Sequence, residues 1–457
     1  MRAKIITALF IVTISLLTVT AHAQPVPGPN VDVTASNDTA ERQQVEPTIG
    51  VDPQNPSIIV AGAQDYRLLS IGGHRWHGYY RSTDNGLTWS VSLVPGFPGD
   101  TSPQGASSPL RAFSCISDPA LAFDRSGNVY YAGISCNFRL FAVKYTNDGA
   151  TYSGATVFPR STFGFADKPW IAVDNSGGPN DGHVYITYDG FGITGVTGAY
   201  FIRSTDGGQA WSFPISAEPA TLTGITVDPI GRVTVSGLDF SPRSTTQANI
   251  FTSTSTDGGE TFHGHEVVAT AILMPSPLPG NQFRTFTIPQ ISSDSNGIYI
   301  VWDDYGLGNS NVLLARSADG GKTWTKPVTV NDALTGQHFF PSIAASNGVI
   351  SVIWYDSRNG QLSNGTITGL DVYYSESTNA GASFSSNVRL TSTGFNPNIV
   401  ERADGGDTEI FMGDYIQVAA SPGTAHAVWA DNRNACDNIV PPFGCTNQDA
   451  FTTTITT

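Results

Sequence analysis

A short turn that recurs six times is the feature that most constrains the fold of this chain. Its copies are residues 82–89 (STDNGLTW), 204–211 (STDGGQAW), 255–262 (STDGGETF), 317–324 (SADGGKTW), 377–384 (STNAGASF) and the degenerate 146–152 (TNDGATY). The Asp or Asn accepts backbone N–H groups across a tight turn, a Gly takes a positive φ, and the final aromatic ring packs against its own sheet. These residues therefore build turns, and we assign no chemistry to them.

A second repeat occurs seven times and carries proline in most copies. The copies are residues 46–52 (EPTIGVD), 118–124 (DPALAFD), 168–174 (KPWIAVD), 223–228 (TGITVD), 288–294 (IPQISSD), 340–346 (FPSIAAS) and 413–419 (GDYIQVA). Each copy is followed by a turn and an apolar strand such as residues 298–302 (IYIVW), and further on by a fourth strand such as residues 326–330 (KPVTV). Four short strands per repeat predict an all-β, seven-bladed β-propeller.

The two ends of the chain predict how the ring closes. The seventh repeat ends after a third strand, residues 449–457, whereas residues 31–34 (VDVT) match a fourth strand. We expect residues 31–34 to complete the last blade, so that the termini join and no sheet edge is left open. Residues 24–30, rich in Pro and Gly, are expected to form a flexible leader, and residues 31–457 a single propeller.

The N-terminal residues predict export from the cytoplasm. Arg2 and Lys4 precede an apolar run over residues 5–19, and residues 21–23 (AHA) match a cleavage site. This pattern predicts a signal peptide over residues 1–23, cleaved after Ala23, and a secreted, periplasmic or extracellular protein. A transmembrane anchor is the alternative, but the run is short and lacks a basic stop. No later stretch is expected to span a membrane.

Four cysteines in an exported chain predict two disulfides. We expect Cys115 to pair with Cys136, because both fall on adjacent strands at the same end of one blade, and Cys436 to pair with Cys445 across a short loop. A cysteine metal site is the alternative, although the chain lacks the CxxC spacing that favours one.

The composition limits the classes of ligand that this protein is expected to bind. A net charge of −15 disfavours nucleic acid and anionic membrane surfaces, both of which need basic patches. We expect a glycan or polysaccharide ligand and a monomeric protein. No cofactor is expected, with calcium the one metal left open.

The topology of a propeller predicts where a site would lie. Strand one of each blade starts, and strand two ends, at the same face of the ring, around the central funnel. Residues expected to bind ligand there are Glu46, Tyr66, Arg67, Tyr355, Arg358, Asp414 and Arg433, and the catalytic candidates are Asp65, Asp356, Asp431 and Tyr415. Arginine forks suit carboxylate or sulfate groups, and aromatic rings suit sugar faces. The alternative is that each Asp–Arg pair closes a local loop and binds no ligand.

On these turns and strands the chain resembles the secreted sialidase-like β-propellers with Asp-box, or BNR, repeats, over nearly all of its mature length. The resemblance implies hydrolysis of a terminal acidic sugar by an arginine triad, a Tyr nucleophile paired with Glu, and an Asp acid/base. Two features depart from the family. The Arg-Ile-Pro stretch that supplies the first arginine is replaced by residues 45–47 (VEP), 167–169 (DKP), 287–289 (TIP) and 339–341 (FFP), and sialidases have six blades instead of seven.

Two functions remain open at this point. The first is a glycoside hydrolase of the sialidase-like kind, with a lyase as a variant, acting on an acidic or complex glycan. The second is a non-catalytic propeller that binds cell-surface glycan or protein. The ring of residues expected around the funnel includes the acidic Glu46, Asp118, Asp167 and Asp414 as well as Lys168. This acidic ring with nearby arginine and tyrosine favours the enzyme, whereas the missing arginine favours the binding protein.

Overall fold

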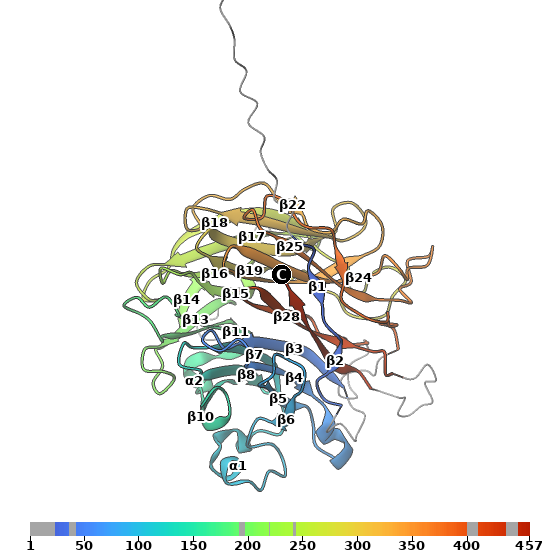
Figure 1. Cartoon of the computed structure of the whole chain (residues 1–457). Helices are drawn as coiled ribbons and strands as arrows, with labels where there is room; N and C mark the ends of the chain where they lie inside the picture. The colour runs from blue at the N-terminus through green and yellow to red at the C-terminus, as the bar shows by residue number, and fades with distance from the viewer. Residues whose placement is uncertain are drawn as a thin grey trace, which may run out of the picture.

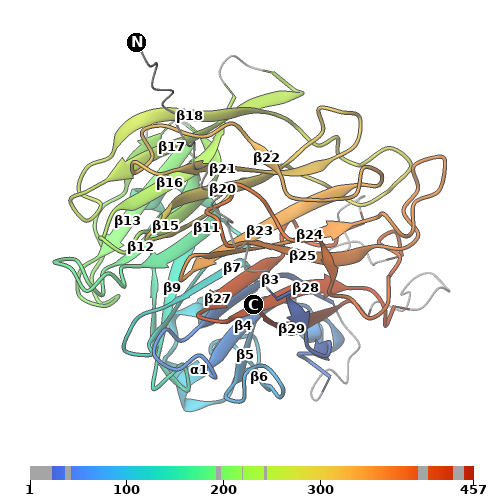
Figure 2. The ribbon, with the colours of Figure 1, turned by 45° about the horizontal axis from the view of Figure 1, so that its top comes forward.

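The chain forms a ring of seven β-sheets (Figures 1 and 2). The computed structural model describes residues 23–35, 43–191, 197–218, 220–240, 244–399, 410–435 and 447–457. Short helical turns join some strands: η1 (Arg67–Ile71), α1 (Pro103–Ser107), η2 (Pro109–Ala112) and α2 (Arg160–Phe163). The prediction of an all-β propeller with seven blades is confirmed.

Each of the first six blades has four antiparallel strands in chain order. They are β3 (Gln44–Val51), β4 (Ile59–Asp65), β5 (Trp76–Ser82) and β6 (Ser90–Leu93); β7 (Ile116–Phe123), β8 (Val129–Ser135), β9 (Leu140–Thr146) and β10 (Thr151–Val157); β11 (Phe165–Val173), β12 (Val184–Phe191), β13 (Gly198–Ser204) and β14 (Ile215–Glu218); β15 (Thr221–Val227), β16 (Val233–Asp239), β17 (Gln247–Ser255) and β18 (His263–Ile272); β19 (Gln290–Asp294), β20 (Gly297–Asp304), β21 (Asn311–Ser317) and β22 (Val328–Thr329); and β23 (His338–Ser346), β24 (Val349–Asp356), β25 (Asp371–Ser377) and β26 (Val388–Arg389).

The seventh blade joins the two ends of the chain. It contains β27 (Gln417–Ser421), β28 (Thr424–Asp431) and β29 (Asp449–Thr456), and β29 also pairs with β1 (Val26–Pro27) and β2 (Val31–Asp32). The predicted N-terminal closure is therefore confirmed, and Figure 1 shows the blue N-terminal strands beside the red C-terminal ones. Residues 24–30, expected as a flexible leader, instead contribute β1, because Val26 and Pro27 pair with Thr456 and Ile455.

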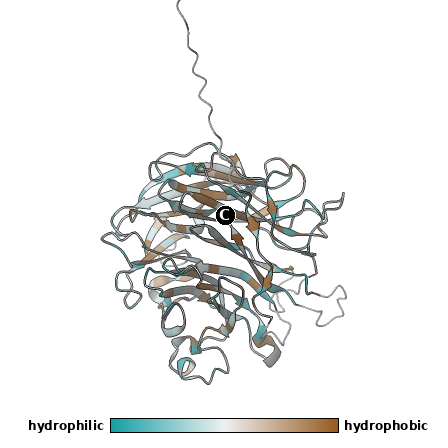
Figure 3. Cartoon of the chain, in the orientation of Figure 1, coloured by the Kyte–Doolittle hydropathy of each residue, from teal (hydrophilic) through white to brown (hydrophobic). Residues whose placement is uncertain are grey.

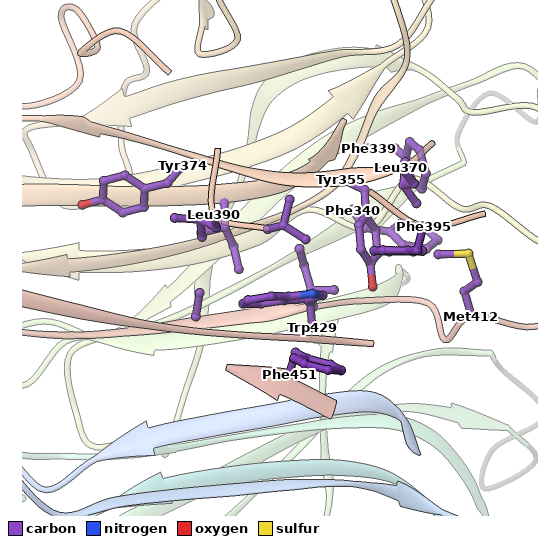
Figure 4. Packing of buried hydrophobic residues seen from close by; sticks show 14 of the residues in the cluster. Phe339, Phe340, Tyr355, Leu370, Tyr374, Leu390, Phe395, Met412, Trp429 and Phe451 are labelled. Atoms are coloured by element: carbon purple, nitrogen blue, oxygen red, sulfur yellow. The ribbon is translucent and has the colours of Figure 1, made fainter. Parts of the chain in front are cut away.

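Packing between neighbouring blades explains the composition of the strands. The second strands β4, β8 and β16 are buried along their whole length, since another blade covers each of their faces. The outer strand β6 instead alternates exposed and half-buried residues. Hydrophobic segments accordingly lie within the blade strands (Figure 3). In the core between blades six and seven, Trp429 and Phe451 of blade seven stack with ring centroids 6.4 Å apart and pack with residues of blade six such as Tyr355 (Figure 4).

The repeated turns form the hydrogen bonds expected from their sequence. In the first copy the Asp84 carboxylate accepts the Thr88 N–H at 2.9 Å and the Ser82 hydroxyl at 2.8 Å, and Gly86 has φ of 84°. Asn379 accepts the equivalent bonds in the sixth copy, from the Ser383 N–H at 3.0 Å and the Ser377 hydroxyl at 2.9 Å. These turns join strands three and four of their blades.

The predicted disulfide between Cys115 and Cys136 is present, with the two Cα atoms 5.6 Å apart. It ties the start of β7 to the end of β8. The second expected pair, Cys436 with Cys445, and the expected signal peptide lie outside the described residues. Among the residues that the structure describes, no helix is long and apolar enough to cross a membrane.

Candidate functional site

A backbone irregularity in the first strand of several blades builds the candidate site. The register between strands one and two shifts after Val45, Ser117, Asp167, Thr221 and Phe339. At each shift one residue that is not glycine adopts a left-handed conformation, with φ between 46° and 58°: Glu46, Asp118, Lys168, Leu222 and Phe340. Such a conformation costs about 1–3 kcal/mol and persists only where the surrounding structure holds it.

Carboxylates hold these left-handed residues in place. The Leu222 N–H donates to Asp189 at 2.8 Å, and the Phe340 N–H donates to Asp303 at 3.0 Å. Both aspartates lie near the end of the second strand of the preceding blade.

Four of the five bulged residues, all except Phe340, line a cavity of about 330 Å³ at this end of the funnel. Its volume falls within the range of small-molecule sites, roughly 300–1,000 Å³. Its polar and charged lining consists of Glu46, Gln64, Arg75, Ser117, Asp118, Ser135, Asp167, Lys168, Arg284 and Asp414, and its aromatic lining of Tyr66, Phe138, Phe286 and Phe411. The residues come from blades one, two, three, four and seven and from the loop before β19.

Two cations clamp a buried carboxylate in the wall of the cavity. The Asp414 carboxylate accepts two hydrogen bonds from the Arg284 guanidinium, at 2.9 and 2.6 Å, and one from Lys168 Nζ. Lys168 Nζ also lies 3.3 Å from the Glu46 carboxylate, to which the Gln64 amide donates as well. Glu46, Lys168 and Asp414 therefore form a connected network across blades one, three and seven.

The environment separates the acidities of the cavity carboxyls. Burial is the main cause that raises the pKa of Asp167 to about 7. The neighbouring Asp118 also raises this pKa, and its effect is larger than the opposite effect of Lys168. Burial likewise raises the pKa of Glu46 well above its ordinary value, with Lys168 offsetting only part of the shift. Burial acts in the same direction on Asp414, but Lys168 and Arg284 outweigh it and lower the pKa of that carboxyl. Groups pushed apart in this way are candidates for acid and base roles.

The three predicted arginines do not meet in the cavity. Each folds back on the aspartate two residues before it: Arg67 on Asp65, Arg358 on Asp356 and Arg433 on Asp431. The described lining of the cavity includes none of these six residues. The expected convergence of the three arginines in the cavity is therefore not found, and each Asp–Arg pair forms a local contact instead.

The surroundings of these pairs show why they stay apart. The Arg358 guanidinium lies 4.1 Å from the Tyr373 ring centroid and 2.6 Å from Asp332, and the Arg433 guanidinium lies 4.2 Å from the Phe451 ring centroid. Both guanidiniums are thus held by the rings of their own blades. The aspartates also accept bonds from their own blades: the Tyr80 hydroxyl donates to Asp65, and the Trp354 and Trp429 indoles donate to Asp356 and Asp431.

The predicted tyrosines divide between the cavity and the core. Tyr66 lines the cavity, together with the predicted Glu46 and Asp414. Tyr415 lies beneath it, with Lys168 Nζ 5.8 Å from its ring centroid and its hydroxyl donating to the Pro119 carbonyl at 3.4 Å. Tyr355 is buried in the apolar core between blades six and seven, where its hydroxyl donates to the Ala430 carbonyl at 2.7 Å (Figure 4).

Several lining residues were not among the catalytic or ligand-binding candidates, although Asp118, Asp167 and Lys168 were expected around the funnel. Asp118 and Lys168 occupy the position before proline that Glu46 occupies in blade one, so the repeat itself carried a signal for them. Asp167 directly precedes that position. Arg75 and Arg284 lie in irregular segments without a repeat, and no sequence signal points to them. In the described part of the chain, no cluster of three or more His, Cys, Asp or Glu side chains is arranged to hold a metal ion.

The chain matches no protein-family model and no curated protein. It is similar in structure to the lectin BP39L from Burkholderia pseudomallei, at 14% identity and a TM-score of 0.49, over 86% of this chain and 94% of the lectin. It is also similar to a Dyadobacter fermentans protein of unknown function, at 15% identity and a TM-score of 0.47, over 94% of this chain and 99% of that protein. The Hadza microbial sialidase Hz136 is similar at 13% identity and a TM-score of 0.47, over 82% of this chain and 76% of the sialidase. These likenesses assign no activity to this chain.

Proposed function

We propose that the cavity binds a glycan and that the protein hydrolyses a glycosidic bond in it, with Asp167 as the proton donor. The observation that carries this proposal is a pair of carboxyl groups in the cavity wall, Asp118 and Asp167, which both accept the Lys168 backbone N–H, at 3.2 and 3.1 Å, and of which Asp167 has its pKa raised by burial to about 7. Such a group still holds its proton near neutral pH, when the oxygen of a breaking glycosidic bond needs one. Asp118, the neighbouring carboxylate, helps to keep that proton in place.

The rest of the lining suits a sugar. Gln64, Arg75 and Arg284 offer hydrogen-bond donors and the carboxylates offer acceptors, so both kinds of partner for hydroxyl groups are close together. Asp118 adds negative charge to the cavity wall, and such charge stabilises the positive sugar ring of a breaking glycosidic bond. Arg75, Lys168 and Arg284 add positive charge, of which Lys168 and Arg284 share theirs with Asp414. A carboxylate or sulfate on the glycan suits these cations, which supports an acidic glycan as the substrate.

Two further features support an exported, glycan-acting protein. The disulfide between Cys115 and Cys136 suits an oxidising compartment. The resemblance of the repeated turns to those of sialidase-like propellers points to the same class of substrate.

A polysaccharide lyase is the second candidate, favoured by the contact between Asp118 and Asp167. In a lyase one carboxylate removes the C5 proton of a uronic acid while its protonated neighbour donates to the leaving oxygen at C4. The C4–O bond breaks and a C4=C5 double bond forms, without water.

The proposal is tested by incubating the purified mature protein with neutral, uronic, sulfated and sialylated oligosaccharides. We expect new reducing ends without a double bond, and an Asp167→Asn variant that is slower by about 10²–10⁴-fold. Asp303→Asn is the matched control. Burial also raises the pKa of Asp303 to about 7, but Asp303 accepts the Phe340 N–H and does not line the cavity, so this variant should keep its activity. An ultraviolet-absorbing unsaturated product would show the lyase instead. Glycan binding without any product would overturn catalysis and leave a binding propeller.

A further inference from the structure

Two exposed phenylalanines lie beside the cavity on blades two and three. Phe138 is 44% exposed and lines the cavity, and Phe165 is 40% exposed at the start of β11. Their ring centroids are 6.3 Å apart. Phe165 precedes Asp167 by two residues on the same strand, and side chains at that spacing share one face of a strand. The aromatic pair therefore borders the proposed proton donor.

The backbone around Phe138 is held from several sides. Its N–H donates to the Ser135 carbonyl at 2.7 Å, and its carbonyl accepts the Ala166 N–H of blade three at 2.9 Å. Phe138 itself adopts a left-handed φ of 58°, which is costly for a bulky residue. The Cys115–Cys136 disulfide anchors the same turn. These contacts hold the backbone from which the exposed Phe138 ring projects.

Phe165 is held in a comparable way. The Arg160 guanidinium carbon lies 3.4 Å from its ring centroid, a cation–π contact that covers part of the ring. The exposed remainder continues the surface of Phe138. Apolar surface that is exposed, rigid and continuous with a polar cavity is typical of a binding site.

We propose that Phe138 and Phe165 form a platform that binds a second sugar of the glycan held in the cavity, an inference that rests on the proposed function. The C–H face of a pyranose ring packs on an aromatic face, while its hydroxyls stay in water. The substrate is then a glycan chain that crosses the blade two to blade three side of the funnel, and affinity grows with chain length because the added sugar reaches the platform.

The test measures how affinity depends on chain length. Two series serve as probes, xylo-oligosaccharides as the neutral one and oligogalacturonides as the acidic one, each as a mono-, di- and tetrasaccharide, backed by a glycan array. Affinities are measured calorimetrically for Asp167→Asn protein, so that no probe is cleaved. We expect Phe138→Ala and Phe165→Ala, each in that background, to lose about three- to tenfold in affinity for the longer chains and little for the monosaccharide, the scale of one aromatic contact.

A matched control separates this role from general surface effects. Phe213 is 79% exposed on the loop between β13 and β14 and does not line the cavity, so Phe213→Ala should bind every chain as the background does. Unchanged melting temperatures confirm that the variants fold. Full affinity for the longer chains in both platform variants would overturn the platform while leaving the proposed function intact. No glycan bound on the array by the wild-type protein would overturn both. Variants that instead abolish self-association, measured by sedimentation, would reassign the platform as a contact between copies of the chain.

Discussion

Replacing Asp167 by Asn tests the electrostatics of the cavity without any knowledge of the substrate. The wild-type carboxyl has a pKa of about 7 in the folded protein against an ordinary value of 3.8. Between these values the folded protein holds a proton that the unfolded chain has lost. The free energy of unfolding of the wild type therefore falls as pH rises through this window. The amide of the variant does not titrate, so Asp167→Asn should gain stability relative to the wild type over the same window.

The size of this gain follows from the shift. One pKa unit corresponds to about 1.36 kcal/mol, so a shift of roughly three units gives at most about 4 kcal/mol. Because Asp167 is only half-buried, screening by solvent reduces this value. We expect the stability of Asp167→Asn relative to the wild type to grow by about 2–3 kcal/mol from about pH 4 to pH 7, the range where the folded and unfolded wild type differ in bound protons.

Guanidinium unfolding of both proteins across a pH series measures this difference directly. Asp319→Asn is the control, since hydrogen bonds from Thr323 and Ser317 lower the pKa of Asp319 and Asn379 occupies the same position in blade six. A depressed pKa contributes stability that is present above the unfolded value and lost below it, so this control should show a flat difference from about pH 5 to 7. A flat difference for Asp167→Asn as well would refute the raised pKa and the proton-donor role built on it.

Three further outcomes follow from the structure. The rate of glycan cleavage should fall as pH rises through about 7, where Asp167 loses its proton. Asp118→Asn removes a like charge and should therefore shift this fall in rate to lower pH by about one pH unit. Asn30→Ala should cost about 1–3 kcal/mol in guanidinium unfolding, because the Asn30 amide joins the ends of the ring to blade six through Leu390 at 2.8 Å. Arg433→Met should leave glycan affinity unchanged in calorimetry, since this arginine pairs with Asp431 outside the cavity; a loss matching that of a lining residue would contradict this assignment.

The architecture could be predicted from the sequence because it depends on short repeated turns and strands whose hydrogen bonds form between residues close in sequence. Each Ser-x-Asp turn needs only its own residues to form, as the bonds from Thr88 and Ser82 to Asp84 show. Seven copies of the first-strand repeat set the number of blades. The incomplete last repeat and the strand-like residues 31–34 together indicated the closure. The pairing of Cys115 with Cys136 followed from the same alternation of strands.

The site was predicted only in part. Glu46, Tyr66 and Asp414 do line the cavity, because the start of strand one and the end of strand two meet at one end of the funnel. The arginines were misplaced because an Asp two residues earlier on the same strand end offers a nearer partner than the funnel does. The sequence pattern alone is compatible with either partner, the local aspartate or a ligand in the funnel.

Tertiary structure alone decided the chemistry of the cavity. The left-handed turn at Lys168 aims its amine at Asp414, a residue 246 positions away, and Arg284 arrives on a loop that belongs to no repeat. The pKa of Asp167 depends on burial and on a carboxylate from the neighbouring blade, and neither exists until the ring has closed. Local hydrogen bonds are encoded residue by residue, whereas desolvation and long-range charge arise only when distant segments pack together.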